Sequence, residues 1–299
     1  MNPADSALRT SVSHVFVTRF NLPTPGPESL VRAQEGWLRN RWELFCRYTV
    51  PSMRAQTSCD YDWLIYFDPE SPPWLLDGVS RHTSAGLYRA LFRTSVSSAG
   101  LLADISDLVR VPGAKLLTTN LDNDDGLAID FAERAVSVST DAPRAAIYLV
   151  NGVIRNGNRL YRRTDRNNAF CSVLEEWDGA LTCWHDWHIL LGRHMPVIEI
   201  EGRPAWLQVV HGTNVSNRVH GHLIDPNQVA SEFGALVTDA SRPGRFLLLA
   251  DRAVFAPARI ARDGLRSAAK SALLAVVGKS GLDSFKQSLA RPKREVVHR

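Results

Sequence analysis

The sequence has few cysteines, and none of them belongs to a CxxC pair. The four in 299 residues are Cys46, Cys59, Cys171 and Cys183. Such wide spacing argues against a zinc ribbon and provides no disulfide framework. We therefore expect reduced thiols in a chain that is long enough to bury its core without disulfides.

Long apolar runs are also missing. No stretch approaches the ~20 apolar residues of a membrane span. The first residues, MNPADSALRTSVSH, lack the basic and apolar regions of a secretion signal. We therefore expect a cytoplasmic protein. Repeats and low-complexity blocks are absent too, and 44% hydrophobic with 22% charged residues is ordinary for a soluble globular enzyme.

The net charge of +4 is small but unevenly placed. Residues 251–299 carry eleven Lys and Arg against four Asp and Glu, or +7, whereas residues 1–250 carry 24 against 27, or −3. A basic end favours an anionic partner, with a solvated extension as the simpler alternative. We predict a main domain over residues 1–255 and a basic helical extension over 256–299. For this extension we expect peripheral contact with an anionic membrane near a lipid-linked acceptor, at the inner face of the membrane.

Short apolar runs alternate with segments of helical period, which indicates an α/β fold with a mixed, mainly parallel sheet flanked by helices. Strands are expected at 12–20, 62–68 and 115–120, helices at 28–48 and 85–110, and a hairpin within 147–163. Pro51 should end the first helix. The hairpin has two turn signals, Asn151-Gly152 and Asn156-Gly157-Asn158. In such sheets ligands bind at the carboxyl ends of the strands.

Three carboxylates lie within four residues, Asp122-Asn123-Asp124-Asp125, directly after the predicted strand at 115–120. Without a counter-charge each raises the pKa of its neighbours. A divalent cation removes that penalty, and oxygen ligands suit Mg²⁺, Mn²⁺ or Ca²⁺ rather than zinc. The run therefore predicts a cation site at the end of a strand.

Three interpretations of this run compete. An EF-hand is disfavoured because its turn glycine would fall at Leu127. The run could instead be an acidic turn in which Asp124 or Asp125 caps a helix that begins near Leu127. The third is the D-x-D motif of nucleotide-sugar transferases, in which Asp122 and Asp124 hold a metal that neutralises the diphosphate leaving group.

Five ordered blocks carry a resemblance to a known family. They are VTRFNL at 17–22, WELFCRYTVPSMRAQT at 42–57, WLIYFD at 63–68, TTNLDNDDGLAIDF at 118–131 and WLQVVHGTNVSNR at 206–218. With these blocks the sequence resembles a bacterial family of rhamnosyltransferases with a GT-A-like (Rossmann-like) glycosyltransferase fold. The resemblance implies a nucleotide-sugar donor, dTDP-rhamnose or a UDP-sugar, and Mn²⁺ or Mg²⁺ as cofactor. Asn120 departs from the arginine-like context that this family usually has before the acidic run.

Within these blocks several residues are candidates for binding the nucleotide-sugar. Thr18, Arg19 and Phe20 end the first strand, where Arg19 could face phosphate or base and Phe20 could stack on the base. A strand-end salt bridge is the alternative for Arg19. Asp68 ends the second strand and could contact the ribose or the base, or could simply cap a turn.

Asp122 and Asn123 complete the predicted nucleotide-sugar set. For the metal we predict Asp122, Asp124 and His211, because His211 follows a β-like run and could reach the same ion from a later segment. A structural histidine is the alternative at that position.

An inverting transfer needs a carboxylate that takes the proton of the acceptor hydroxyl. Glu175 is our first candidate for this base and Asp186 the second, and either could instead be an ordinary surface acid. Aromatic side chains could form platforms for sugar rings, although most such residues are part of a core. The four considered are Tyr161, Trp184, Trp187 and Trp206.

The predicted function is a metal-dependent glycosyltransferase that acts on a glycan or lipid-linked acceptor. One alternative is a metal-dependent phosphoesterase, which would release phosphate without a sugar acceptor. Another is a non-catalytic module that binds carbohydrate or nucleic acid, and nucleic-acid binding would weaken steeply with salt. For the transferase we expect no nucleic-acid partner.

Overall fold

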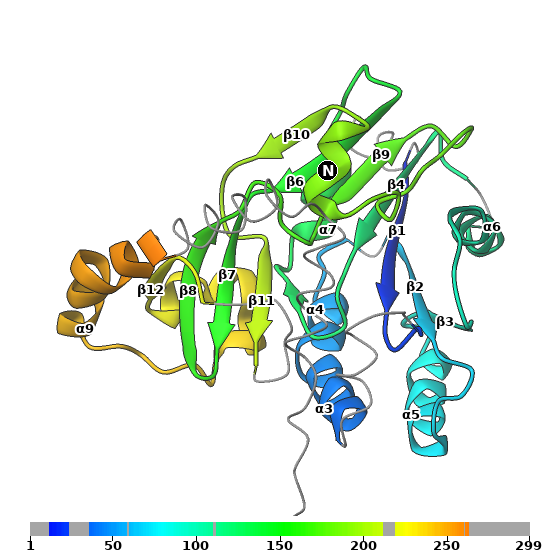
Figure 1. Ribbon diagram of the computed structural model, residues 1–299. Helices are drawn as coiled ribbons and strands as arrows, with labels where there is room; N and C mark the ends of the chain where they lie inside the picture. Colours follow the sequence, from blue (N-terminus) through cyan, green and yellow to red (C-terminus); the bar gives the residue numbers. More distant parts are fainter. Residues whose placement is uncertain are drawn as a thin grey trace, which may run out of the picture.

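The computed structural model describes residues 12–23, 36–58, 60–109, 112–211, 219–259 and 261–262. Two β-sheets organise these residues, and Figure 1 shows them side by side, with helices α3 and α4 below the junction. The predicted helical residues 28–35, Cys59 and most of the predicted extension from residue 263 onward lie outside the described part.

The first sheet has seven strands in the order β10-β6-β9-β4-β1-β2-β3. Their bounds are β1 Val12–Arg19, β2 Asp62–Phe67, β3 Arg89–Phe92, β4 Lys115–Asn120, β6 Arg144–Leu149, β9 Ser172–Glu175 and β10 Val197–Ile200. Strand β9 runs antiparallel to its neighbours β4 and β6, and the other pairs are parallel. The predicted mixed, mainly parallel sheet is confirmed.

The second sheet has five strands in the order β12-β8-β7-β11-β5. Their bounds are β5 Gly126–Leu127, β7 Asn151–Asn156, β8 Arg159–Thr164, β11 Trp206–Val210 and β12 His222–Ile224. Strand β7 follows β6 after one residue, and β11 pairs with β7 as β10 pairs with β6. Two neighbouring segments of the chain therefore pass together from the first sheet into the second.

Helices cover both faces of the first sheet. On one face lie α3 Trp37–Leu44, the π-helical η1 Phe45–Thr49, α4 Val50–Arg54, α5 Pro73–Ser84 and α7 Phe131–Val136. On the other lie α6 Ser98–Leu108 and the 3-10 helix η2 His188–Arg193. The second sheet packs against α8 Ala230–Phe233 and η4 Gly234–Val237, after the short turn η3 Pro226–Gln228. The described chain continues with α9 Arg245–Ala250 and the π-helical η5 Asp251–Phe255.

The central strand β1 shows why both faces are covered. Its consecutive residues Val15, Phe16 and Val17 are all buried, Phe16 in the cluster under α4, α5 and α7, and the two valines in the cluster under α6. A continuous apolar run of this kind is typical of a parallel strand between two helical layers.

Two expected helix boundaries are wrong. The helix does not end at Pro51, because the wider π-helical turn of η1 directly before it accommodates a residue that has no amide donor. The segment 85–110 is not helical throughout, since it contains the edge strand β3 before α6. Beyond the predicted boundary at residue 255, residues 256–259 continue the helix of η5.

One of the two predicted hairpin turns is wrong as well. Asn156-Gly157-Asn158 does form the turn between β7 and β8, with Gly157 at a φ of 58°. Asn151-Gly152 instead lies inside β7. A Cβ on Gly152 would come within 2.0 Å of the Trp206 ring, so this glycine is needed for close packing between neighbouring strands rather than for a turn.

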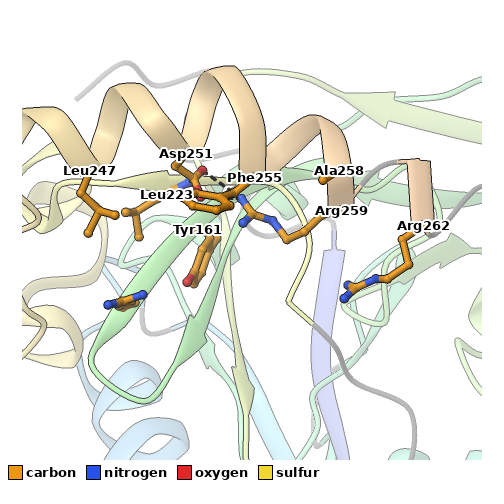
Figure 2. Close-up of a pocket in the computed structure, with 9 residues that line it drawn as sticks. Tyr161, Leu223, Leu247, Asp251, Phe255, Ala258, Arg259 and Arg262 are labelled. Atoms are coloured by element: carbon orange, nitrogen blue, oxygen red, sulfur yellow. Dashed lines mark hydrogen bonds and ion pairs between the residues drawn. The ribbon is translucent and has the colours of Figure 1, made fainter.

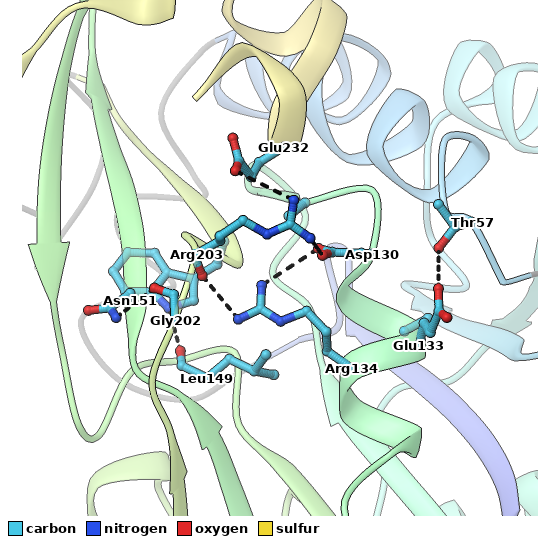
Figure 3. A network of polar contacts seen from close by, with 12 residues as sticks. Thr57, Asp130, Glu133, Arg134, Leu149, Asn151, Gly202, Arg203 and Glu232 are labelled. Carbon is cyan, nitrogen blue, oxygen red and sulfur yellow. Dashed lines mark hydrogen bonds and ion pairs between the residues drawn. The ribbon is translucent and has the colours of Figure 1, made fainter. Parts of the chain in front are cut away.

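A polar network holds the start of β11 in place (Figure 3). Arg203, just before this strand, donates to Asp130 at 2.7 Å, and Arg134 of α7 donates to the Arg203 carbonyl at 3.0 Å. The Arg203 guanidinium also lies 3.9 Å from Glu232. These contacts fix the direction in which β11 runs toward His211. Among the described helices, none has the length and apolar character needed to span a membrane.

Buried His14 in β1 predicts a pH dependence of stability. Its Nε2 lies 2.8 Å from Thr119 Oγ1, and burial lowers its pKa from 6.5 to about 3. Between these values the unfolded chain binds a proton that the folded chain does not, so stability falls as the pH drops below 6.5. This group alone should remove about 1.4 kcal/mol of unfolding free energy per pH unit.

Urea unfolding between pH 7 and pH 5 measures this slope, and His14→Gln provides the comparison. The variant should be less dependent on pH over that range, whatever its absolute stability. Equal slopes for the two proteins would show that His14 titrates normally in the folded state.

Candidate functional site

The acidic run lies where the two sheets meet. Strand β4 of the first sheet ends at Asn120 and β5 of the second begins at Gly126, so residues 121–125 form the crossing between them. The amide of Leu121 donates to the carbonyl of Val17 at 3.1 Å, which fixes the run at the carboxyl end of β1. The predicted position at the end of a central strand is the one observed.

The structure excludes the helix-capping interpretation of the run. The next helix, α7, begins at Phe131, and its N-cap residue is Asp130, which makes no side-chain capping bond. Residues Gly126 and Leu127 pair with β11 as strand β5. Asp124 and Asp125 therefore have partners other than a helix end.

Asp124 is buried and joined to two other segments of the chain. Arg41 of α3 forms an ion pair with its Oδ2, and His211 Nε2, just after β11, lies 2.8 Å from the same oxygen. Burial raises the pKa of this carboxyl, but the hydrogen bond from His211 and the charge of Arg41 outweigh it and leave the pKa below its usual value. Asp124 is therefore ionised near neutral pH.

Asp122 is the exposed acid of the run. Desolvation of its carboxylate, together with the charge of Asp124, raises its pKa to about 6. Asn120 Nδ2 donates to its Oδ1 at 3.3 Å. A carboxylate held in this state gains from any cation that reaches it.

Asp125 serves as a link to the second sheet. Its Oδ1 accepts the amide of Val209 in β11 at 2.7 Å, while its buried Oδ2 has no hydrogen-bond partner among the described residues. Burial and the charges of Asp124 and Asp122 raise its pKa well above the usual value. We infer that Asp125 is a neutral acid that holds β11 beside the run.

Asn123 points back to the first strand rather than outward. Its amide nitrogen donates to the carbonyls of Phe20 and, at 3.3 Å, Arg19. Its oxygen accepts from Arg41 at 3.3 Å. Asn123 thus lies in the site, where it joins the end of β1 to the run.

The rim of the site contains Arg19, Asn120 and Trp184. The exposed guanidinium of Arg19 lies 4.1 Å from the centre of the Trp184 ring, and Trp184 Nε1 donates to Asn120 Oδ1 at 2.8 Å. Asn120 therefore joins Trp184 to Asp122. Arg19 and Trp184 are placed as an exposed cation and an aromatic surface beside the acidic run, which suits phosphate and ring binding.

The geometry does not support the expected roles of Thr18 and Phe20. Thr18 is fully buried, and its hydroxyl accepts from Trp63 Nε1 at 3.0 Å. Phe20 is 1% exposed and packs among aromatic rings, including Phe45 at 5.3 Å and Phe67 at 5.0 Å. Alternation along β1 sends both side chains into the core, so neither faces the site.

Asp68 caps a turn. Its Oδ1 accepts the amide of Glu70 at 2.8 Å, and its carbonyl accepts the amide and the hydroxyl of Ser71 at 3.1 and 2.7 Å. It lies at the carboxyl end of β2, next to the end of β1. The turn-capping alternative describes what this side chain does in the structure.

Glu175 is not brought to the acidic run. It pairs with Leu116 at the opposite end of β4, is fully buried, and accepts from Arg144 Nε at 2.6 Å. It also accepts the amides of Leu181 and Thr182 at 2.8 and 2.7 Å. Because Thr182 has a φ of 67°, unusual for a β-branched residue, these bonds stabilise a strained loop that leads to Trp184. Glu175 has no access to an acceptor hydroxyl.

Asp186 follows Trp184 on the same loop and is partly exposed. It accepts from His194 Nε2 at 2.9 Å and from the amide of Trp187 at 2.7 Å, and these hydrogen bonds lower its pKa. Of the other predicted aromatic platforms, Trp187 is exposed, whereas Trp206 and Tyr161 are buried in the core.

The donors present fit a divalent cation. Asp124 Oδ2 and His211 Nε2 are 2.8 Å apart, and two ligands at right angles on an ion with bonds of ~2.1 Å lie about 3 Å apart. Within the described ranges no three His, Cys, Asp or Glu side chains gather closely enough to hold a metal on their own. A site that holds Mg²⁺ through one or two carboxylates commonly completes its shell with substrate phosphate and water.

Arg41 is the site residue that the sequence did not reveal. It comes from α3, far from the run in the chain, and its guanidinium pairs with Asp124 and lies 5.4 Å from the centre of the Trp37 ring. Three adjacent carboxylates do indicate a missing counter-charge. Among 35 Lys and Arg, however, nothing in the sequence alone selects this one.

Two solved structures are similar to this chain over about two thirds of its length or more. S. aureus TarS 1–349 in complex with UDP has 9% identity and a TM-score of 0.42, covering 67% of this chain and 60% of that chain. GalNAc-T7 with UDP, GalNAc and Mn²⁺ has 10% identity and a TM-score of 0.40, covering 73% and 48%. The chain thus spans less than two thirds of either structure. Likeness at this level does not establish a relationship.

No curated protein sequence matches the chain significantly. A family described as "Putative rhamnosyl transferase" does match it, over residues 13–223. This range contains both sheets except for the first residue of β1 and the last of β12, and it contains every residue of the acidic site, from Arg19 to His211. The chain therefore belongs to the rhamnosyl transferase family.

Proposed function

We propose that this protein transfers a sugar, rhamnose, from a nucleoside-diphosphate donor to a glycan or lipid-linked acceptor with the help of Mn²⁺ or Mg²⁺. The observation that carries the proposal is the meeting of Asp124 and His211, 2.8 Å apart, beside exposed Asp122 at the end of β4. Membership of the rhamnosyl transferase family supports the choice of sugar, with dTDP-rhamnose as donor and a UDP-sugar as the alternative.

Different residues of the protein have different roles in donor binding. Asp122, Asp124 and His211 would hold the cation, which when bound neutralises the negative charge of the departing diphosphate. Arg19 provides a further positive charge on the rim, and Trp184 provides a flat surface for the base or the sugar. Asn123 and Asp125 keep the run in register with β1 and β11.

Arg41 has a different part in this arrangement. Its ion pair with Asp124 stabilises the ionised form of the second carboxylate of the D-x-D pair. Displacing or sharing this ion pair is the step by which cation binding would reach Asp124. The phosphoesterase alternative uses the same carboxylates, but nothing in the site favours water over a sugar hydroxyl.

The first prediction concerns nucleotide binding. Titration of dTDP, and then UDP, into the protein by calorimetry should show binding that depends on Mn²⁺. Asp124→Asn should weaken it by at least about tenfold, because even residues that only support metal ligands change affinity by that factor. Asp122→Asn should also weaken nucleotide binding. Because Asp122 is exposed, this variant should fold as the unmodified protein does.

The matched control is Asp77→Asn, which removes an exposed carboxylate from α5 far along the chain from the run. Its nucleotide affinity should equal that of the unmodified protein. Thermal unfolding of each variant establishes that it is folded. Unchanged, Mn²⁺-dependent affinity in folded Asp124→Asn and Asp122→Asn would refute the proposed donor site.

For an inverting transfer we propose Asp186 as the base. It is partly exposed and lies on the loop that presents Trp184 at the rim of the site. Asp186→Asn should lower kcat by about 100-fold or more, the usual effect of removing a general base, while donor affinity stays the same. Glu176→Gln removes another exposed acid, just after β9, and should leave kcat unchanged. Equal rates for the two variants would assign the base elsewhere.

Localisation at the cytoplasmic face of the membrane is part of the same proposal. A lipid-linked acceptor would be met there, and the basic residues beyond 255 suit such a surface.

A further inference from the structure

The helix formed by α9 and η5 presents large apolar side chains to solvent. Phe246 is 86% exposed, Leu249 66%, Val254 58% and Phe255 50%. Four of the nine large apolar side chains exposed in the described chain thus lie within ten residues. Phe255 lines the pocket between the helix and the second sheet, so Phe246, Leu249 and Val254 form the outward group. Single exposed apolar residues are common, but a group of this kind marks an interaction surface.

The opposite side of this helix is fixed to the second sheet (Figure 2). Buried Asp251 accepts the amide of Leu223 at 2.7 Å and both its oxygens accept from Arg259 at 2.9 Å. Arg259 also donates to the carbonyl of Gly221 at 2.8 Å and lies 5.2 Å from the centre of the Tyr161 ring. The helix cannot roll inward to bury Phe246 without breaking these bonds.

The turn type within the helix keeps Phe246, Leu249 and Val254 on one side. In η5 the amide of Ala256 donates to the carbonyl of Asp251, five residues back, as in a π-helix. This wider turn brings Val254 toward the side of Phe246 and Leu249 more closely than an α-helical turn would. The result is one outward apolar face.

Cationic side chains flank this apolar face. Arg245 and Arg252 are exposed, as is Arg242 just before the helix. The acids nearest to them in the sequence are paired with other residues, Asp239 with Arg155 and Asp251 with Arg259. In sequence, residues 263–299 add eight Lys and Arg against three Asp and Glu, or +5. The exposed surface of the helix therefore combines apolar and positive groups, with its acids neutralised.

We propose that the outward face of α9 and η5, with Phe246, Leu249 and Val254 at its centre, binds the surface of an anionic lipid membrane. Apolar side chains of such a helix enter the boundary between headgroups and acyl chains, and Lys and Arg beside them are attracted to anionic headgroups. A second copy of the chain fits this face less well. In a two-fold contact the arginines that flank this face in one copy would be brought toward those of the other, and like charges repel.

This proposal does not depend on sugar transfer, and its test uses no activity. The protein is sedimented with vesicles of pure phosphatidylcholine and with vesicles that contain 30% phosphatidylglycerol. We expect binding to the anionic vesicles that weakens as salt is added, and much weaker binding to the neutral ones. Absence of binding to the anionic vesicles would overturn the proposal.

The double variant Phe246→Ser/Leu249→Ser tests the apolar face, and both positions are exposed enough that folding is preserved. Its partition into anionic vesicles should fall at least about tenfold. Ile189→Ser, the same kind of change at a 53% exposed residue of η2, is the control and should bind as the unmodified protein does. Arg245→Gln/Arg252→Gln should reduce binding to anionic vesicles and its dependence on salt.

Two outcomes would contradict the assignment of this face. One is unchanged vesicle binding by Phe246→Ser/Leu249→Ser, which would place the contact elsewhere. The other is a dimer in analytical ultracentrifugation that this double variant abolishes, without any binding to vesicles. Calorimetric titration of dTDP separates this test from that of the donor site, since the double variant should retain the nucleotide affinity of the unmodified protein.

Discussion

The rest of the structure depends on the neutralisation of adjacent carboxylates at the crossing between two sheets. Three acids lie within four residues, and they can be this close because Asp124 has a counter-charge and Asp125 is kept neutral. The groups that bond these acids come from separate elements, Arg41 from α3, the Val209 amide from β11, His211 from just after β11, and Asn120 from β4. Electrostatics therefore joins the two sheets and α3 at one place, and that place is the carboxyl end of the central strands.

The same constraint explains the shape of the site. The second sheet begins directly after the run, and its strand β11 returns to place His211 beside Asp124. Glu175, although it is not near the run, fixes the loop that presents Trp184 on the rim. Glu175, which the sequence analysis assigned to catalysis, thus has a structural role instead. Buried polar groups that are fully bonded specify one arrangement of a loop.

Much of the fold follows from the sequence because apolar periodicity and strand-end polarity are local signals. Strands β1, β2 and β4 and the D-x-D position were predicted within about one residue. Partners distant in the chain were not predictable, as Arg41 shows. The direction of two side chains was also predicted wrongly. Thr18 and Phe20 lie at the end of a strand, but the alternation of side chains along it points both into the core. Gly152 was mistaken for a turn residue because the need for glycine there comes from a tertiary contact, the packing of the Trp206 ring against it.

The central claim is that Asp124 and His211 share one cation with a nucleoside diphosphate. Electron-nuclear double resonance on Mn²⁺ bound to the protein with dTDP tests it most directly, with histidine labelled with ¹⁵N. We expect ³¹P couplings from the diphosphate and a coupling from one directly bound histidine nitrogen, and the nitrogen signal should vanish in His211→Gln. A spectrum of Mn²⁺ surrounded only by water in the presence of dTDP would contradict the claim.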